Sequence, residues 1–553
     1  MKANNASLAV AAILAGGVIP AQALELYVDT KTQQVFTAPG KNRVRLGEFQ
    51  KVDETAGSKS STADAGELER KLDQKKVELE AIEARLDKKQ ASLKSIDEKL
   101  DKAQVAAAPA KDGAHVKLGE NGLELSSDDG NFKAKIGGRL QIESQVNWND
   151  PDSPAGADLS NGVGIRRARL YTDGTIFKDY EYRFEYDWAR NNGGTQGVTD
   201  AFLKYVHFKP FAITIGQQNE GKSMQSVMSN NYLLFNERSL PNNAFIEAGP
   251  NSKYQLGVTA ETYDKAWQMP YTIRGGITTE SLGAPAPGTS SNNPNGNINR
   301  NAFSGDISYQ LVGRGTLVPY MDKEGNFLHT GLWGSWRSIN NNYNPDGTLR
   351  DGGWQYVSAP DTNVDRTNWA NTGNLTNPGA GFEAKEVAML GAELAGSYGP
   401  VHMAAEYMQA QPSGKGYDSD DVLTGYYVEG GWLLTGEHRP YDEKKGTWGR
   451  LAPNHNFIFG NGWGAWELAV RFDSLDMNTK NINGGALAAG TIGLNWYLTS
   501  HVRIITDWVH VFSTSTGSAG KCTYPATQTA SDSIGCFNGL NPDMWQTSVR
   551  VDF

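Results

Sequence analysis

The stretch YEYRFEYDW, residues 180–188, decides the fold class, because its side chains alternate strictly in character. Aromatic residues occupy every second position from Tyr180 to Trp188, and charged residues fill the positions between them. Successive side chains of a β-strand point to opposite faces, so the stretch predicts a strand with one apolar and one charged face. The same alternation runs from residue 131 onward and recurs in WQTSVRVDF, residues 545–553.

Alternation alone fits a soluble sandwich as well as a membrane barrel. Strand-like runs of about 9 to 15 residues favour the barrel, because a tilted transmembrane strand needs this length. Aromatic residues at strand ends, such as Trp148, Trp188 and Trp545, are typical of an interfacial girdle. Short turns alternate with long polar loops at 279–301, 338–384 and 513–541, which also indicates a barrel with two unlike rims.

The pattern predicts an all-β fold, a 16-stranded antiparallel transmembrane β-barrel over residues 131–553. Strands are expected to begin near residues 132, 163, 180, 198, 211, 251, 269, 302, 326, 385, 400, 423, 464, 484, 501 and 545. In a barrel of this size side chains cannot fill the interior, so an aqueous channel is expected.

The N-terminal part has a different organisation. Residues 1–23 read as a signal peptide, with a basic start, a short apolar core and an A-x-A cleavage site, so the mature chain leaves the cytoplasm. Residues 24–66 are expected to form a small β segment and a linker. Over 67–104, Leu or Ile fills eight of ten heptad seam positions, which predicts a periplasmic coiled coil. A linker is expected over 105–130.

Composition narrows the partners. A net charge of −10 argues against broad nucleic-acid binding. The two cysteines, Cys522 and Cys536, cannot build a metal framework alone, and no cofactor is predicted. Because both lie in the last long loop, outside the cytoplasm, we expect them to form a disulfide.

The segment AITIGQQNEGKSM, residues 212–224, matches a P-loop letter for letter. A P-loop requires a βαβ unit with continuously apolar parallel strands, whereas the neighbouring strands alternate and are joined as hairpins. We therefore interpret residues 217–250 as the third long loop, folded into the barrel. Lys222 and Arg238, with Glu220 and Glu237, would then stand at the constriction; a loop on the outer surface is the alternative.

The chain resembles the phosphate-selective porins, the porin O and P family, over residues 131–553. The motifs that carry the resemblance are IGGRLQ (136–141), RRARLYTDG (166–174), YEYRFEYDWAR (180–190), NERSLP (236–241), GAWELAVRFDSLDMN (464–478), GLNWYL (493–498) and a terminal Phe553. The resemblance implies a homotrimer of sixteen-stranded barrels in the bacterial outer membrane that passes small anions passively.

The resemblance also implies pore residues. Arg166 and Arg167 match the family's paired arginines, and Asp200 matches an acidic residue near the constriction. Since adjacent residues of a regular strand face opposite ways, one of the two arginines is expected to lie above the lipid or to meet a loop. Inward-facing positions of the first strand add Lys133 and Arg139 to the pore lining.

The sequence also departs from the family. Ser226 stands where the family has a loop lysine, and only Arg337, Arg350 and Arg366 fall in the region of the family's arginine ladder. We therefore expect a weak anion preference without sharp selection of phosphate.

These patterns predict a porin for small hydrophilic solutes, without enzyme activity. Two alternatives stay open. The barrel could anchor a tether from the outer membrane to the cell wall through the coiled coil. It could also be an outer-membrane hydrolase, although the chain has neither G-x-S-x-G nor H-E-x-x-H.

Overall fold

The computed structural model describes residues 24–29, 35–36, 43–49, 89, 113–119, 122–151, 159–190, 197–247, 253–279, 281, 308–339, 354–377, 381–515 and 537–553. The chain divides into two units, residues 1–109 and 110–553. In the first unit, three antiparallel strands form a sheet of order β2-β1-β3; they are β1 (Leu24–Asp29), β2 (Val35–Phe36) and β3 (Arg43–Phe49). The expected signal peptide, the coiled coil apart from the helical Lys89, and both cysteines lie outside the described residues.

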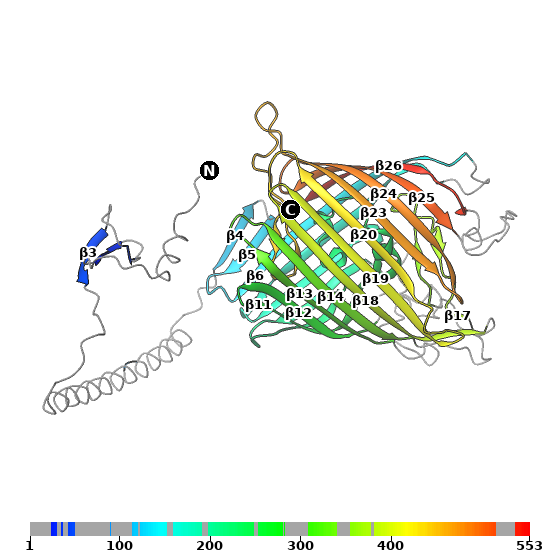
Figure 1. Ribbon diagram of the computed structural model, residues 1–553, viewed down its shortest axis with the longest axis horizontal. Helices are drawn as coiled ribbons and strands as arrows, with labels where there is room; N and C mark the ends of the chain where they lie inside the picture. The colour runs from blue at the N-terminus through cyan, green and yellow to red at the C-terminus, as the bar shows by residue number, and fades with distance from the viewer. Residues whose placement is uncertain are drawn as a thin grey trace, which may run out of the picture. The chain divides into compact units, whose positions relative to one another are not determined.

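The second unit is a closed antiparallel barrel with sixteen wall strands (Figure 1), which confirms the expected fold class. The wall strands are β6 (Phe132–Trp148), β7 (Gly162–Ile176), β8 (Tyr180–Asp187), β9 (Val198–Tyr205), β10 (Ala212–Asn219), β11 (Tyr254–Ala266), β12 (Met269–Thr278), β13 (Gln310–Met321), β14 (Phe327–Ser338), β18 (Phe382–Tyr398), β19 (Val401–Lys415), β20 (Leu423–Leu433), β23 (Ala465–Asn478), β24 (Asn483–Tyr497), β25 (Val502–Ser515) and β26 (Asp543–Asp552). Pairing of β26 with β6 closes the wall. The strand starts lie close to the expected ones, except that β13 is described from Gln310 rather than 302.

Alternation along each strand explains how the wall divides lipid from lumen. On β8, Phe184 is exposed on the outer surface while Glu185 and Asp187 are buried inside. On β26, Trp545 is exposed and Arg550 is buried. A one-residue slip in register would turn every charged side chain outward, so the pattern fixes both strand and register. Among the described residues, no helix is long and apolar enough to cross a bilayer.

The two rims of the barrel differ. We call the rim with the short connections after β7, β9, β11, β13 and β18 the turn rim, and the opposite one the loop rim. One connection at the turn rim is long: residues 434–464, the turn-side segment, join β20 to β23 and contain β21 (Tyr441–Asp442) and β22 (Thr447–Trp448). The alternation pattern did not single out this segment.

The linker expected over 105–130 was wrong for residues 114–127. They form a hairpin of β4 (Ala114–Gly119) and β5 (Gly122–Ser127), and β5 pairs with the start of β6. The reason is an unpaired edge, because β26 reaches only as far as Arg139 of β6. Residues 133–136 of β6 would otherwise leave their backbone groups without a strand partner on that side.

Candidate functional site: the channel constriction

The loop between β10 and β11 folds into the barrel, and we call its described residues, 220–247 and 253, the constriction loop. Most of its side chains from 220 to 246 are buried. Its regular structure is limited to short helical turns: α2 (Met224–Val227), η3 (Asn230–Tyr232), α3 (Leu240–Asn242) and η4 (Asn243–Glu247). The alternative of an outer surface loop is therefore wrong.

The residues that match the P-loop pattern have a different structural role in this protein. The strands on either side, β10 and β11, are antiparallel neighbours, so no βαβ unit exists at this place. Gly221 has φ +89°, a backbone conformation that favours glycine. The Ser223 hydroxyl caps α2 by accepting from the Ser226 N–H at 3.3 Å. The motif is thus the sharp entry of the chain into the lumen.

Carboxylates of the barrel wall hold the backbone N–H groups of this loop. Glu406 of β19 accepts from the N–H groups of Met224 (3.2 Å) and Gln225 (2.8 Å). Asp507 of β25 accepts from Asn236 N–H at 2.7 Å, and Asp473 of β23 accepts in the same way from the loop's Leu240 at 2.9 Å. Carboxyl oxygens of the wall therefore satisfy backbone donors that the loop cannot satisfy itself.

Arginines of the same wall hold the carbonyl groups. Arg503 of β25 donates to the carbonyl oxygens of Leu233 (2.7 Å) and Leu234 (3.2 Å). Further donations to loop carbonyls come from Arg550 to Asn230, Phe235 and Asn236, from Arg471 to Glu237, and from Asn495 to Leu234. The loop is therefore bound along its length to strands β19 to β26.

A β-bulge settles the direction of the paired arginines. In the β6–β7 ladder Gln141 pairs with Arg167 and Ile142 pairs with Ile165, so Arg166 is an extra residue. Such a bulge interrupts the strict alternation of a strand. Both side chains consequently point into the barrel, Arg166 toward the constriction loop and Arg167 to the side-chain oxygen of Gln141 at 2.5 Å. One of them meets a loop, as expected, and neither faces lipid.

Arg166 forms a two-pronged ion pair with Glu237 of the constriction loop. Its Nε and Nη2 atoms lie 2.5 and 2.9 Å from the two carboxylate oxygens, and both side chains are nearly buried. Burial opposes ionisation of the carboxyl, but the charge and hydrogen bonds of Arg166 outweigh it and lower the pKa of Glu237 to about 2. The pair connects the constriction loop to β7.

The structure places Lys222 and Arg238 away from the open channel. Lys222 is 3% exposed, and its Nζ lies 3.1 Å from Glu220 in a small cavity against β13 and β18. Burial lowers the pKa of Lys222, and the neighbouring Glu220 partly offsets this. Arg238 bonds to Glu247 at 2.6 Å and to two carbonyls of its own loop. Both residues shape the loop rather than line the passage.

The open part of the lumen is a cavity of about 600 Å³ between the constriction loop and strands β6 to β13. Its lining holds eleven basic side chains, Lys135, Arg139, Arg169, Arg183, Lys204, Lys253, Arg274, Arg314, Lys444, Lys445 and Arg450. Five acidic side chains oppose them, Asp173, Glu185, Asp200, Glu261 and Asp552. The expected Lys133 lines a second cavity nearby, at the β4–β5 hairpin.

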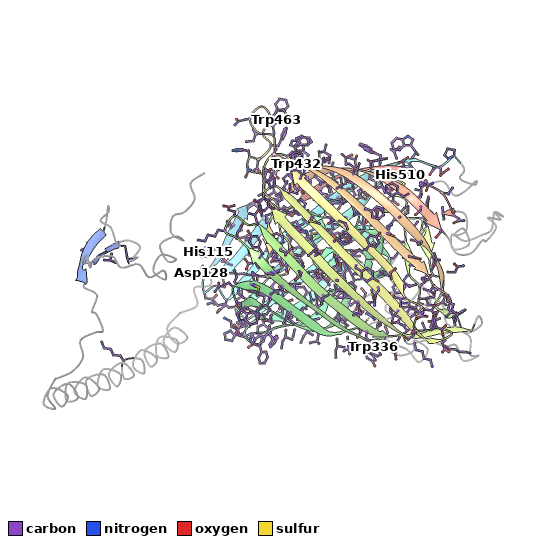
Figure 2. The ribbon with its side chains drawn as sticks, viewed as in Figure 1. His115, Asp128, Trp336, Trp432, Trp463 and His510 are labelled. Atoms are coloured by element: carbon purple, nitrogen blue, oxygen red, sulfur yellow. The ribbon has the colours of Figure 1, made fainter. Side chains whose placement is uncertain are left out.

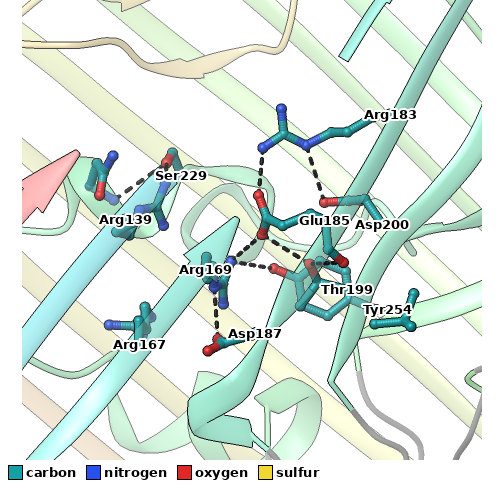
Figure 3. Close-up of polar contacts among 12 residues, drawn as sticks. Arg139, Arg167, Arg169, Arg183, Glu185, Asp187, Thr199, Asp200, Ser229 and Tyr254 are labelled. Atoms are coloured by element: carbon teal, nitrogen blue, oxygen red, sulfur yellow. Dashed lines mark hydrogen bonds and ion pairs between the residues drawn. The ribbon is translucent and has the colours of Figure 1, made fainter. Parts of the chain in front are cut away.

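Figure 3 shows that some of these basic side chains form ion pairs with acidic side chains of the lumen. Arg183 lies 2.5 Å from Glu185 and 3.6 Å from Asp200, so the acidic residue expected at the constriction belongs to an ion-pair network. Arg169 bridges Glu185 and Asp187, each at 2.7 Å. Arg139 has a single long contact, 3.4 Å to the Ser229 hydroxyl of the constriction loop. Of these arginines, Arg139 is the one that makes no direct hydrogen bond or ion pair with a carboxylate of this network, although Glu185 acts on its charge from a longer distance.

The turn-side segment is the part of the site that sequence reasoning missed. It enters the lumen from the turn rim, where Arg314 of β13 donates to the carbonyl oxygens of Lys445 (2.9 Å) and Gly446 (2.7 Å). Arg439 donates to the Tyr232 carbonyl of the constriction loop. In the sequence, the signal for the turn-side segment was the length of the connection between two alternating strands. The lumen is therefore narrowed from both rims.

The Arg166–Glu237 pair gives the first prediction. Replacing Glu237 with Gln leaves a nearly buried guanidinium without its counter-charge, a change that typically costs about 3–5 kcal/mol. We expect the constriction loop to loosen and single-channel current noise to rise. The matched control, Asp418→Asn, breaks the exposed Asp418–Lys480 pair and should leave recordings unchanged.

The same pair predicts the pH dependence. Because folding lowers the pKa of Glu237 from 4.5 to about 2, its stabilisation is present above pH 4.5, declines as pH falls below that value and is gone below about pH 2. Wild-type noise should thus stay constant from pH 7 to pH 4.5. Noise that rises within this range, or a quiet Glu237→Gln channel, would contradict the role of the pair.

Comparisons with known proteins find relatives of this chain. The family described as phosphate-selective porin O and P matches residues 134–529. Porin O of Pseudomonas aeruginosa is 25% identical over 419 residues, 73% of this chain and 89% of that protein; a protein of Caulobacter vibrioides is 30% identical over 385 residues, 69% and 68%. A solved anion-selective porin from Comamonas acidovorans is 11% identical with a TM-score of 0.43, covering 76% of this chain and all of that one. The chain belongs to the phosphate-selective porin O and P family of outer-membrane channels.

Proposed function

We propose that the protein lets small hydrophilic solutes diffuse across the outer membrane with a weak preference for anions. The observation that carries this proposal is the lining of the open cavity, where basic side chains outnumber acidic ones by eleven to five. The sign of the charge along a narrow aqueous pore sets which ions enter it more easily. Small anions are therefore the favoured solutes, and Lys135, Arg139 and Arg183 are the residues we assign to them.

The preference is weak because much of the basic charge is already paired. Arg183 and Arg169 share Glu185, and Arg314 is bound to Glu393 of β18 at 2.8 Å. A water-filled lumen also screens the remaining charge, with a Debye length of about 8 Å at physiological ionic strength. The net field is positive but short in range.

Sharp selection of phosphate needs several basic groups close together, because they must replace the hydration of a multiply charged anion. Arg337 instead donates to Gln255 (2.5 Å) and Ser308 (3.1 Å), outside the open cavity. Arg366 donates to Asn243 of the constriction loop at 3.3 Å. Ser226, at the position of the family's lysine, carries no charge. Phosphate is thus one permeant anion among others.

The family assignment favours a channel over the hydrolase alternative. By the same resemblance we propose a homotrimer whose N-terminal region lies in the periplasm. The tethering alternative depends on residues 67–104, and a trimer would bring three such segments together for cell-wall contact. The full chain, including the expected signal peptide, has a mass of 60.1 kDa. A native mass that corresponds to a single mature chain would contradict the trimer, for which a mass about three times as large is expected.

Reversing charge at the cavity tests the anion preference. In Lys135→Glu/Arg139→Glu, two basic side chains of β6 become acidic, so the lining changes from a clear basic excess to near balance. We expect the reversal potential in a KCl gradient to shift toward the equilibrium potential of potassium ions. Lys480→Glu is the control, because Lys480 is exposed outside the cavity and its reversal should leave the potential unchanged. A double variant that keeps the wild-type potential would exclude the cavity as the selective region.

The competition between anions tests the second half of the proposal. For the wild-type channel we expect chloride and phosphate currents of similar size, and an anion preference that declines as salt concentration rises. Chloride conductance should be measured while phosphate is added at low salt. Block of the chloride current by micromolar phosphate would contradict the proposal and indicate a tight phosphate site.

A further inference from the structure

The second half of the turn-side segment leaves the lumen and forms a short arm, residues 455–463, at the turn rim. Figure 2 shows Trp463 projecting beyond the wall, past Trp432 of β20. The arm ends in a tight turn in which Ile458 and Gly462 form a β-bridge. At its tip Phe459 is 95% exposed, and Trp463 is 78% exposed. The arm is thus apolar yet reaches away from the barrel.

Two tryptophans of the wall fasten the arm. Trp466 of β23 and Trp496 of β24 stack with ring centroids 5.0 Å apart. Their indole N–H groups both donate to the carbonyl oxygen of Trp463, at 3.2 and 2.8 Å. Phe457 packs edge-on against Trp496 at 5.0 Å. Because hydrogen bonds and ring packing hold both ends of the turn against the wall, the fold itself keeps the tip of the arm exposed.

The chemistry of the arm points to one kind of partner. Its nine residues, HNFIFGNGW, include no lysine, arginine, aspartate or glutamate. An exposed apolar cluster of this kind marks an interaction surface. The outward side chains of the adjoining strands are also apolar, as at Trp432, Leu468 and Val470, so the arm continues the lipid-facing surface of the barrel. Tryptophan and phenylalanine beside asparagine suit the boundary between acyl chains and headgroups.

We propose that residues 455–463 form a membrane anchor whose tip inserts into the lipid leaflet at the turn rim. Phe459 and Ile458 enter the acyl region, and the Trp463 ring lies at the headgroup level. The anchor fixes the outer end of a segment whose inner end lies in the lumen, where the Thr447 hydroxyl donates to the Met224 carbonyl of the constriction loop at 3.4 Å. The bilayer therefore helps to hold one wall of the constriction in place.

The test places a nitroxide on the arm of the full-length channel in vesicles of phosphatidylethanolamine and phosphatidylglycerol. Phe459→Cys is made in a Cys522→Ala/Cys536→Ala background and labelled. Because Phe459 is almost wholly exposed, the label should not disturb folding, and heat-modifiable migration on a gel checks this. Leu468→Cys is the lipid-facing control, and Lys444→Cys, which lines the cavity, is the aqueous control.

Collision of the label with oxygen and with a water-soluble nickel chelate reports its surroundings. We expect the label at 459 to lose access to nickel relative to the label at 444, and to gain access to oxygen, as at 468. Nickel access equal to that at 444 would overturn the anchor, because the arm would then lie in water. Spin–spin broadening that disappears on dilution with unlabelled protein would also overturn it, since a second copy would then cover the arm.

Discussion

The structure depends on one constraint: where an irregular loop packs against the inner wall of a barrel, the backbone polar groups that it removes from water must be bonded to protein. The constriction loop has no long helix or strand that could satisfy them internally. Unsatisfied buried N–H and C=O groups are costly, so non-helical backbone at membrane depth persists only where other groups bond to it. Here the charged inner faces of β19 to β26 do so, carboxylates to N–H groups and arginines to carbonyls, as with Asp507 and Arg503.

This constraint divides the charged residues of the lumen between two tasks. On strands β19 to β26, arginines such as Arg471 and Arg550 are bonded to loop carbonyls, so they hold the constriction in shape. On strands β6 to β13, arginines such as Arg139 and Arg183 face the open cavity. A count of arginines over the whole sequence would thus overstate the charge that a passing ion meets. Only one side of the lumen sets the proposed preference.

Sequence alone could predict the barrel because a period of two residues is a local signal that each strand carries by itself. It located the constriction loop for the same reason, as a long break between two alternating strands. It could not place Lys222, because the bend at Gly221 turns that side chain into the wall. The bulge at Arg166 and the β4–β5 hairpin depend on which backbone groups of neighbouring strands lack partners, and a single sequence does not reveal this.

Hydrogen–deuterium exchange of the reconstituted channel, read by mass spectrometry of peptides, tests the binding of the loop to the wall most directly. The backbone amides of residues 222–246 belong to a loop but are buried and held by wall carboxylates at Met224, Gln225 and Asn236. The account predicts exchange as slow as that of the neighbouring strands β10 and β11. Exchange as fast as that of the exposed turn 207–210, between β9 and β10, would contradict it.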